Sequence, residues 1–227
     1  MSTPQLPLSL RAPPDQRLDA FLGQPLVRDA VRAAARGESR DWLFLAGPAG
    51  SGKSHLLLAA CAEAASAGRR AAYLPLAAFA GRLAAALAQQ EGFDLVCLDG
   101  LDAIAGNAED EEALFHFHNR ARAGGGVVLY AARGNPAALG IVLPDLVTRL
   151  GQCVRLTLEP LDEAGRRAVL RERAARRGLE LDDTVLDYLL RRVDRDLASL
   201  TRLLDTLDRA SLAAQRRITI PFLRQHL

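Results

Sequence analysis

Short apolar runs alternate with longer stretches of helical periodicity over the first two thirds of the chain. Five of the runs have the length of buried strands: 42–46, 71–76, 93–98, 127–131 and 154–158. Helices are predicted beside and between them at 25–36, 53–67, 77–89 and 109–123. Alternating strands and helices of this size are typical of an α/β fold, so we expect a five-stranded parallel sheet covered by helices on both faces.

The pattern changes after Pro160, where apolar residues recur at helical spacing and no further strand is predicted. Helices are expected at 163–177, 183–192, 197–215 and just after Pro221. The first 16 residues carry four prolines and neither periodicity, which indicates a flexible arm. We therefore expect an arm over 1–16, an α/β domain over 17–159 and a small all-α lid domain over 160–227.

Composition and charge exclude several classes of protein. The 29 basic and 27 acidic residues leave a formal charge of +2, too little for tight nucleic-acid binding by bulk charge. Three separated cysteines without a CxxC pair argue against a disulfide framework or a zinc site, and the histidines lack metal-ligand spacing. No secretory signal and no apolar run long enough for a membrane span is found, so a cytoplasmic protein is expected.

The strongest chemical signal fits the pattern GxxxxGK[ST] between a predicted strand and a predicted helix. Its residues are Gly47, Pro48, Ala49, Gly50, Ser51, Gly52, Lys53 and Ser54. In such a loop, backbone N–H groups and the helix dipole hold phosphates, Lys53 reaches the β- and γ-phosphates and the Ser54 hydroxyl ligates Mg²⁺. Lys53 is the only lysine in the chain, so a compact ammonium is kept at the one position that needs it. This loop predicts binding of ADP or ATP.

Asp99 ends the third predicted strand, where a carboxylate can contact the hydration shell of Mg²⁺. Taken alone, it could equally be an ordinary turn residue before Gly100; its place about 45 residues after a phosphate loop favours metal contact. Hydrolytic sites of this kind add a second carboxylate at the next position, which here is Gly100. Asp102 follows two residues later and could point elsewhere. Slow ATP hydrolysis by the chain itself is therefore expected.

The phosphate loop, the Asp-ended strand and the helical lid resemble those of the AAA+ ATPases. Further segments resemble the DnaA/Hda branch of that family, and they extend over nearly the whole chain: QLPLSL at the start, SHLLLAACAE after the loop, LVCLDGLDAIAG around Asp99, LPDLVTRL at 143–150 and LDRASLAAQRRITIPF at 207–222. The resemblance implies an AAA+ P-loop domain followed by a lid, and a role in regulating the initiation of DNA replication.

Four residues of the arm match the QLxLxL-type peptide by which members of this branch bind the β sliding clamp: Gln5, Leu6, Leu8 and Leu10. The alternative from the residues alone is an apolar start that packs on its own domain. The resemblance also implies contact with DNA only indirectly, through the clamp, and we expect no DNA-reading domain in the chain itself.

Arg149 matches the arginine finger of the family, a guanidinium that completes the active site of a neighbouring subunit. Its local alternative is an ion pair with Asp145, four residues earlier on the same predicted helix. Arg195 corresponds to the lid arginine that touches the nucleotide, although with Arg191 and Arg192 it could instead form a solvated basic face. Arg133 stands where relatives carry an acid, which leaves the γ-phosphate sensor unassigned.

Together these matches imply a negative regulator that docks on the DNA-loaded clamp and stimulates hydrolysis of DnaA-bound ATP through Arg149. The resemblance implies that the ADP form is the active one, with the nucleotide fixing the lid. The sequence does not decide whether the protein forms a homodimer. The main alternative is a helicase-loader-like AAA+ ATPase acting on single-stranded DNA. A small-molecule kinase is a third possibility, but no segment offers an acceptor pocket and catalytic base.

Overall fold

The computed structural model describes residues 17–179, 181–192, 203, 206, 207, 210 and 219–226. The predicted arm over 1–16 lies outside these residues. The strands of the described part are β1 (Leu43–Ala46), β2 (Ala71–Pro75), β3 (Leu95–Asp99), β4 (Val127–Ala132) and β5 (Val154–Thr157). The α-helices are α1 (Pro25–Arg36), α2 (Lys53–Ser66), α3 (Leu83–Ala88), α4 (Ala108–Ala123), α5 (Pro144–Gly151), α6 (Glu163–Arg176), α7 (Asp183–Arg192) and α9 (Ile220–His226). Short 3₁₀ helices are η1 (Leu18–Ala20), η2 (Leu76–Ala78), η3 (Leu101–Ala103) and η4 (Pro136–Ala138).

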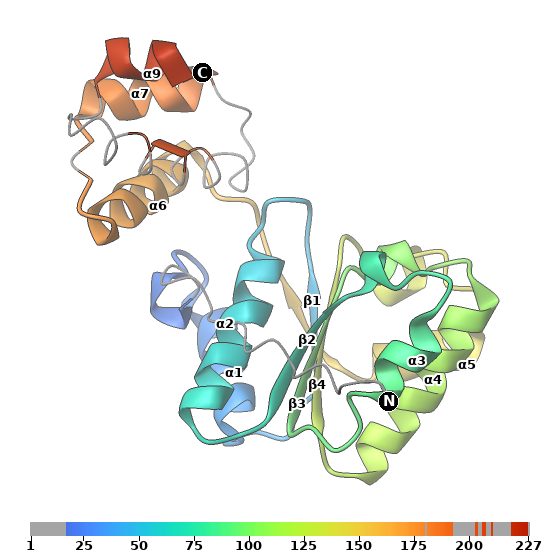
Figure 1. Cartoon of the computed structure of the whole chain (residues 1–227). Helices are drawn as coiled ribbons and strands as arrows, with labels where there is room; N and C mark the ends of the chain where they lie inside the picture. The colour runs from blue at the N-terminus through green and yellow to red at the C-terminus, as the bar shows by residue number, and fades with distance from the viewer. Residues whose placement is uncertain are drawn as a thin grey trace, which may run out of the picture.

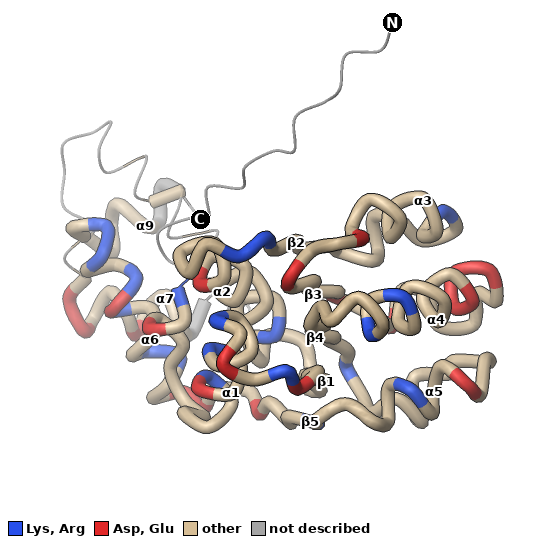
Figure 2. Tube along the Cα trace, turned by 90° about the horizontal axis from the view of Figure 1, so that it is seen from below, with Lys and Arg blue, Asp and Glu red and all other residues tan. Residues whose placement is uncertain are grey.

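The five strands form one parallel sheet in the order β2-β3-β4-β1-β5. This confirms the five-stranded parallel sheet that the apolar runs predict. Every residue of β1 and β4 is buried and uncharged, and Figure 2 draws these two strands in tan. The register pairs Asp99 with Ala131 and Ala46 with Ala132, so β3, β4 and β1 end at the same edge. Residues that follow these strands are therefore neighbours.

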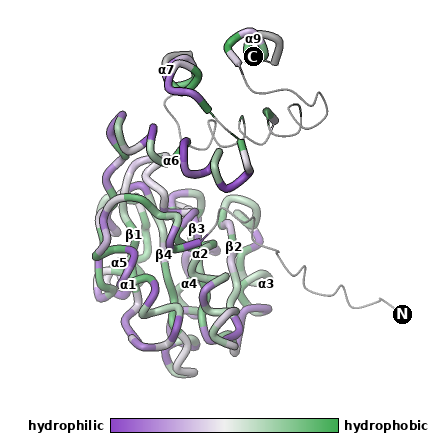
Figure 3. The backbone as a smooth tube through the Cα atoms, turned by 90° about the vertical axis from the view of Figure 1, so that its left-hand side faces the viewer, coloured by the Kyte–Doolittle hydropathy of each residue, from purple (hydrophilic) through white to green (hydrophobic). Residues whose placement is uncertain are grey.

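Helices cover both faces of the sheet, as predicted. Figure 1 shows α1 and α2 on one face and α3, α4 and α5 on the other. Helix α1 buries Val27, Val31, Ala34 and Ala35, whose spacing keeps them on one side of the helix. It ends at Gly37, whose φ of +77° is the left-handed conformation of a helix C-cap. The hydrophobic core lies between these helices and the sheet, and Figure 3 shows the strands mostly in green.

The single helix predicted at 77–89 is wrong. The chain instead forms η2 and then the short α3, with a turn at Gly81, whose φ is +79°. The buried carboxylate of Asp110 on α4 accepts hydrogen bonds from the N–H groups of Gly81 (2.6 Å) and Leu83 (3.0 Å). Asp110 is distant in sequence from this segment, so its hydrogen bonds to these N–H groups are tertiary contacts. The helix propensity of this alanine-rich segment is overridden by tertiary contacts.

The described part of the C-terminal region is helical, as the change of pattern after Pro160 predicts. Helices α7 and α9 share a small apolar core that includes Val185, Leu189, Phe222 and Leu223. Of the helix predicted at 197–215, positions 203, 206, 207 and 210 are described, and they are helical. Among the described residues, no helix combines the length and the apolar character that crossing a bilayer requires.

Candidate nucleotide-binding site

The loop over residues 47–52 leads from β1 to the first residue of α2. Gly50 and Gly52 have φ values of +77° and +95°, which glycine adopts without strain. A Cβ atom at Gly47 would lie 2.4 Å from the Leu158 carbonyl oxygen, and one at Gly52 would lie 2.8 Å from the Phe21 ring. The loop therefore needs glycine for both conformation and space. It curls at the N-terminus of α2, where N–H groups and the helix dipole favour an anion.

Lys53 lies at the centre of this loop. Its Nζ atom donates hydrogen bonds to the carbonyl oxygens of Gly47 (2.5 Å) and Pro48 (2.7 Å), and it lies 3.4 Å from Ser51 Oγ. Burial lowers the pKa of the ammonium, the carboxylates of Asp99 and Asp102 oppose that shift, and the charge of Arg133 adds to it. The Lys53 ammonium and the carboxylates of Asp99 and Asp102 are therefore close enough to interact electrostatically.

Asp99, the last residue of β3, is bound by a residue that the sequence did not single out. The Tyr73 hydroxyl on β2 donates a hydrogen bond to Asp99 Oδ2 at 2.7 Å. In the sequence, Tyr73 is a tyrosine within a predicted strand. An ordinary strand residue would have the same pattern, so the sequence alone did not single it out. The contact depends on the register of β2 against β3.

Asp102 does not point away from the site. Its two carboxylate oxygens accept hydrogen bonds from the Arg133 N–H at 3.1 and 3.0 Å, which ties η3 to the end of β4. Gly100, at the position of the expected second carboxylate, has a φ of +83°. A side chain at this position would meet no neighbour but would be strained by the backbone. The chain thus lacks the second carboxylate at a position where the backbone itself favours glycine.

The oxygen groups at this edge fit a magnesium ion better than a softer metal. Ser54 and Asp99 supply a hydroxyl and a carboxylate, which are hard donors of the kind that Mg²⁺ takes together with phosphates. Among the described residues, no group of three or more His, Cys, Asp and Glu side chains could hold a metal ion by itself. A Mg²⁺ ion would therefore be shared with the phosphates of a nucleotide, whose binding it would strengthen by neutralising charge.

A cavity of about 270 Å³ opens beside the phosphate loop. It is lined by the segment 20–24, the loop at 50–52, His55, the residues 159–162, and Val169 and Arg173 of α6. The rings of Phe21 and His55 stack with their centroids 6.1 Å apart. An aromatic and apolar wall next to a phosphate loop suits the base and sugar of a nucleotide. Because α6 contributes to the wall, one ligand could contact both the sheet domain and the lid.

His55 in this cavity is uncharged at neutral pH. Its Nε2 atom lies 3.1 Å from the Arg17 carbonyl oxygen, which fits an Nε2–H donor. Burial, helped by the charges of Arg173 and Arg176, lowers its pKa to about 4, against the opposing effect of the hydrogen bond to Arg17. A neutral ring adds no charge to the cavity wall and keeps its face available for stacking.

Arg149 lies on α5, on the face of the sheet opposite α2 (Figure 1). Its side chain is exposed, and within the described part of the chain it forms no ion pair with Asp145 and no hydrogen bond with the phosphate loop. The structure thus does not bring Arg149 to the chain's own site. Other predicted site residues lie outside the described residues: Gln5, Leu6, Leu8, Leu10 and Arg195.

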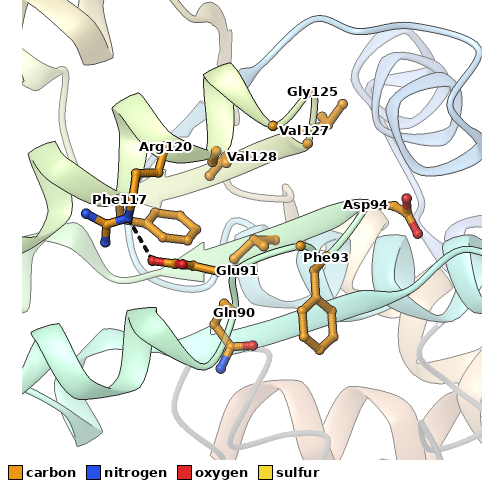
Figure 4. Close-up of a pocket in the computed structure, with 14 residues that line it drawn as sticks. Gln90, Glu91, Phe93, Asp94, Phe117, Arg120, Gly125, Val127 and Val128 are labelled. Atoms are coloured by element: carbon orange, nitrogen blue, oxygen red, sulfur yellow. Dashed lines mark hydrogen bonds and ion pairs between the residues drawn. The ribbon is translucent and has the colours of Figure 1, made fainter.

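A second pocket, of about 240 Å³, lies at the opposite edge of the sheet, where β3 and β4 begin. Figure 4 shows Phe117 and Val128 beside it and a dashed line from Arg120 to Glu91. The guanidinium Nε donates to the carboxylate at 2.7 Å. At this pocket the two opposite charges neutralise each other directly.

The strand order, the phosphate loop after β1, the Asp-ended β3 and the helical lid define an AAA+ fold, which confirms the predicted fold class. Residues 162–227 match the family described as Hda, lid domain. Domain III of the Thermotoga maritima replication initiation protein DnaA has a TM-score of 0.76 at 22% identity, over 92% of this chain and 94% of that chain. These findings confirm the resemblance to the DnaA/Hda branch.

Two further solved structures share the fold. AMPPCP-bound DnaA from Aquifex aeolicus has a TM-score of 0.69 at 24% identity, over 86% of this chain. The chain spans 65% of that protein, slightly less than two thirds. The Thermotoga maritima RuvB Holliday junction branch migration motor has a TM-score of 0.65 at 21% identity, over 92% of this chain and 70% of that chain. At these identities the likeness shows the fold.

Proposed function

We propose that this protein is a DnaA-related negative regulator of replication initiation. It binds ADP or ATP with Mg²⁺, docks through its arm on the DNA-loaded β sliding clamp, and presents Arg149 to ATP bound by DnaA. The Hda-type lid at 162–227 and the phosphate loop support the regulator class. The observation that carries the mechanism is the exposed Arg149 side chain on α5, across the sheet from the chain's own phosphate loop.

Within this proposal the chain's own nucleotide is a structural ligand. Lys53 and the N–H groups of the loop hold the phosphates, Ser54 and Asp99 hold Mg²⁺, and Arg195 contacts the phosphates from the lid. The cavity beside the loop includes Val169 of α6, so a bound nucleotide would fix the lid against the sheet domain. Gly100 leaves the attacking water without a carboxylate base, and we expect slow hydrolysis by the isolated chain. Turnover of several ATP per second would contradict this.

The role of Arg149 is tested by loading DnaA with radiolabelled ATP and adding the protein, the clamp and DNA. Arg149→Ala should abolish the stimulated hydrolysis, because a trans arginine accelerates phosphoryl transfer by about 10³ to 10⁵. Arg40→Ala is a matched control, since Arg40 is also exposed but lies in the segment before β1 and not on α5. Stimulation by Arg149→Ala equal to that of wild type would refute the mechanism.

Docking on the clamp is tested separately through the arm. Gln5→Ala should abolish binding to purified clamp in a surface-capture assay, because Gln5 supplies the oriented amide of the peptide. Gln16→Ala lies outside the peptide and should bind like wild type. A protein that binds single-stranded DNA but not the clamp would favour the helicase-loader-like alternative.

A further inference from the structure

Tyr73 contacts Asp99, one of the two residues assigned to Mg²⁺. It pairs with Cys97 in the β2–β3 ladder, two residues before Asp99. Because side chains alternate along a strand, Cys97 and Asp99 point to the same face of the sheet, and Tyr73 points with them. Helix α2, which begins with Lys53 and Ser54, covers that face. The phenol therefore lies on the α2 side of the sheet and reaches the end of β3.

The hydroxyl group of Tyr73 donates its proton to Asp99 Oδ2 at 2.7 Å. Tyr73 is only partly exposed, so water competes little for this hydrogen bond. The bond holds the Asp99 carboxylate in one orientation at the end of β3.

This hydrogen bond matters for a cation. A carboxylate that holds a metal-bound water needs one oxygen free for it, and Tyr73 occupies only Oδ2 of Asp99. The carboxylate is thereby oriented for a hard cation before it binds.

We infer that Tyr73 is a positioning residue of the Mg²⁺–nucleotide site, whose hydroxyl sets the orientation of the Asp99 carboxylate. It acts through Asp99 and makes no contact with the reacting atoms. The inference rests on the proposed nucleotide binding. Partners that orient metal ligands change metal affinity by about 10-fold to 100-fold when removed.

The test compares binding of fluorescent mant-ADP in EDTA with binding at increasing Mg²⁺ concentrations. Tyr73→Phe should leave the affinity in EDTA within about twofold of wild type and raise the Mg²⁺ concentration needed for half of the Mg²⁺-dependent gain at least about tenfold. Tyr130→Phe is the matched control, because it removes a buried tyrosine hydroxyl that bonds His118 at 2.9 Å instead. It should bind like wild type under both conditions.

A second comparison separates positioning from a loss of structure. Tyr73→Phe should have little further effect on the Mg²⁺ requirement when Asp99→Asn is already present, because Tyr73 acts through the Asp99 carboxylate. An unchanged Mg²⁺ requirement in Tyr73→Phe, or an equal loss of affinity in EDTA and in Mg²⁺, would overturn the inference about Tyr73 alone. Wild type that fails to bind mant-ADP at all would overturn the proposed nucleotide binding as well.

Discussion

The two edges of the sheet hold their charged groups in opposite ways. At the edge where β3 and β4 begin, Arg120 and Glu91 form a direct ion pair. At the other edge, Lys53 is held by backbone carbonyls, Asp99 by a tyrosine hydroxyl and Asp102 by a backbone N–H. Among the described residues, no ion pair joins Lys53 to either aspartate. A charge that is hydrogen-bonded to neutral groups is not cancelled by an opposite charge. It can therefore still attract an ionic ligand.

Two further carboxylates near the phosphate-loop edge are also hydrogen-bonded to neutral backbone groups. Asp110 binds two backbone N–H groups beside α3. Glu111, which is fully buried, accepts from the N–H groups of Gly106 (2.7 Å), Val142 (2.9 Å) and Leu143 (2.8 Å). Both lie in the first turn of α4, where the helix dipole stabilises negative charge. Asp110 thereby fixes the turn before α3, and Glu111 fixes the loop that leads into α5, the helix that carries Arg149.

The largest expected effect comes from removing a charge that has no ionic partner. Lys53→Ala should weaken binding of mant-ADP with Mg²⁺ about a thousandfold, about 4 kcal/mol, since more than one charge-assisted hydrogen bond to phosphate is lost. Arg120→Ala removes an exposed ion pair of the opposite edge and should change the affinity less than twofold. Both are measured by fluorescence titration.

The contrast between the edges would fail if the two variants lost affinity to a similar degree. Lys53→Arg sharpens it, because a guanidinium keeps the charge but not the compact shape that fits between the Gly47 and Pro48 carbonyls. We expect this variant to bind closer to Lys53→Ala than to wild type.

A somewhat smaller effect is expected from the buried carboxylate that fixes the loop before α5. Glu111→Gln should lower the free energy of unfolding by about 3 kcal/mol, because an amide offers one acceptor oxygen and turns an N–H₂ group toward backbone donors. Glu112→Gln is the neighbouring control, since Glu112 is exposed and contacts only His116, at 3.5 Å, among the ion pairs of the described residues. Its change should stay within about 0.5 kcal/mol in urea unfolding. Equal stability of the two variants would show that Glu111 does not fix the loop.

Local patterns predicted the parts of the fold and site that depend on neighbouring residues. The apolar runs mark all five strands, and the glycines of the phosphate loop lie within one short segment between a strand and a helix. The end of α1 at Gly37 needs only the left-handed conformation of that residue. The roles of the predicted site residues themselves stay predictions.

Long-range contacts explain what the sequence did not predict. The helix expected at 77–89 is broken by Asp110, about 30 residues further along. Tyr73 reaches Asp99 only through the register of two strands, and Asp102 reaches Arg133 across the end of β4. Neither periodicity nor a sequence motif could predict these contacts, because each depends on how segments distant in sequence pack together.

The smallest expected effect compares one histidine near each edge. His55 lies beside the phosphate loop, and His118, under Trp42 and bonded to Tyr130, lies near the start of β1. Burial, together with nearby arginines, lowers the pKa of each to about 4.

Since the unfolded pKa is about 6.5, each ring takes up a proton only on unfolding between these values. The stability is therefore fully present above about pH 6.5 and is lost as the pH falls toward 4. Between pH 7 and pH 5, each ring should cost about 2 kcal/mol of unfolding free energy, measured in urea.

Substituting each ring separates the two edges. His55→Gln and His118→Gln should each reduce this pH dependence by about half. Saturating ADP with Mg²⁺ should then distinguish the two buried histidines. A ligand in the cavity changes both the burial of His55 and the charge around it and should shift its pKa, seen by NMR, while His118 at the far edge titrates unchanged. If ADP shifted the pKa of His118 and not that of His55, the nucleotide would occupy the wrong edge of the sheet for the proposed site.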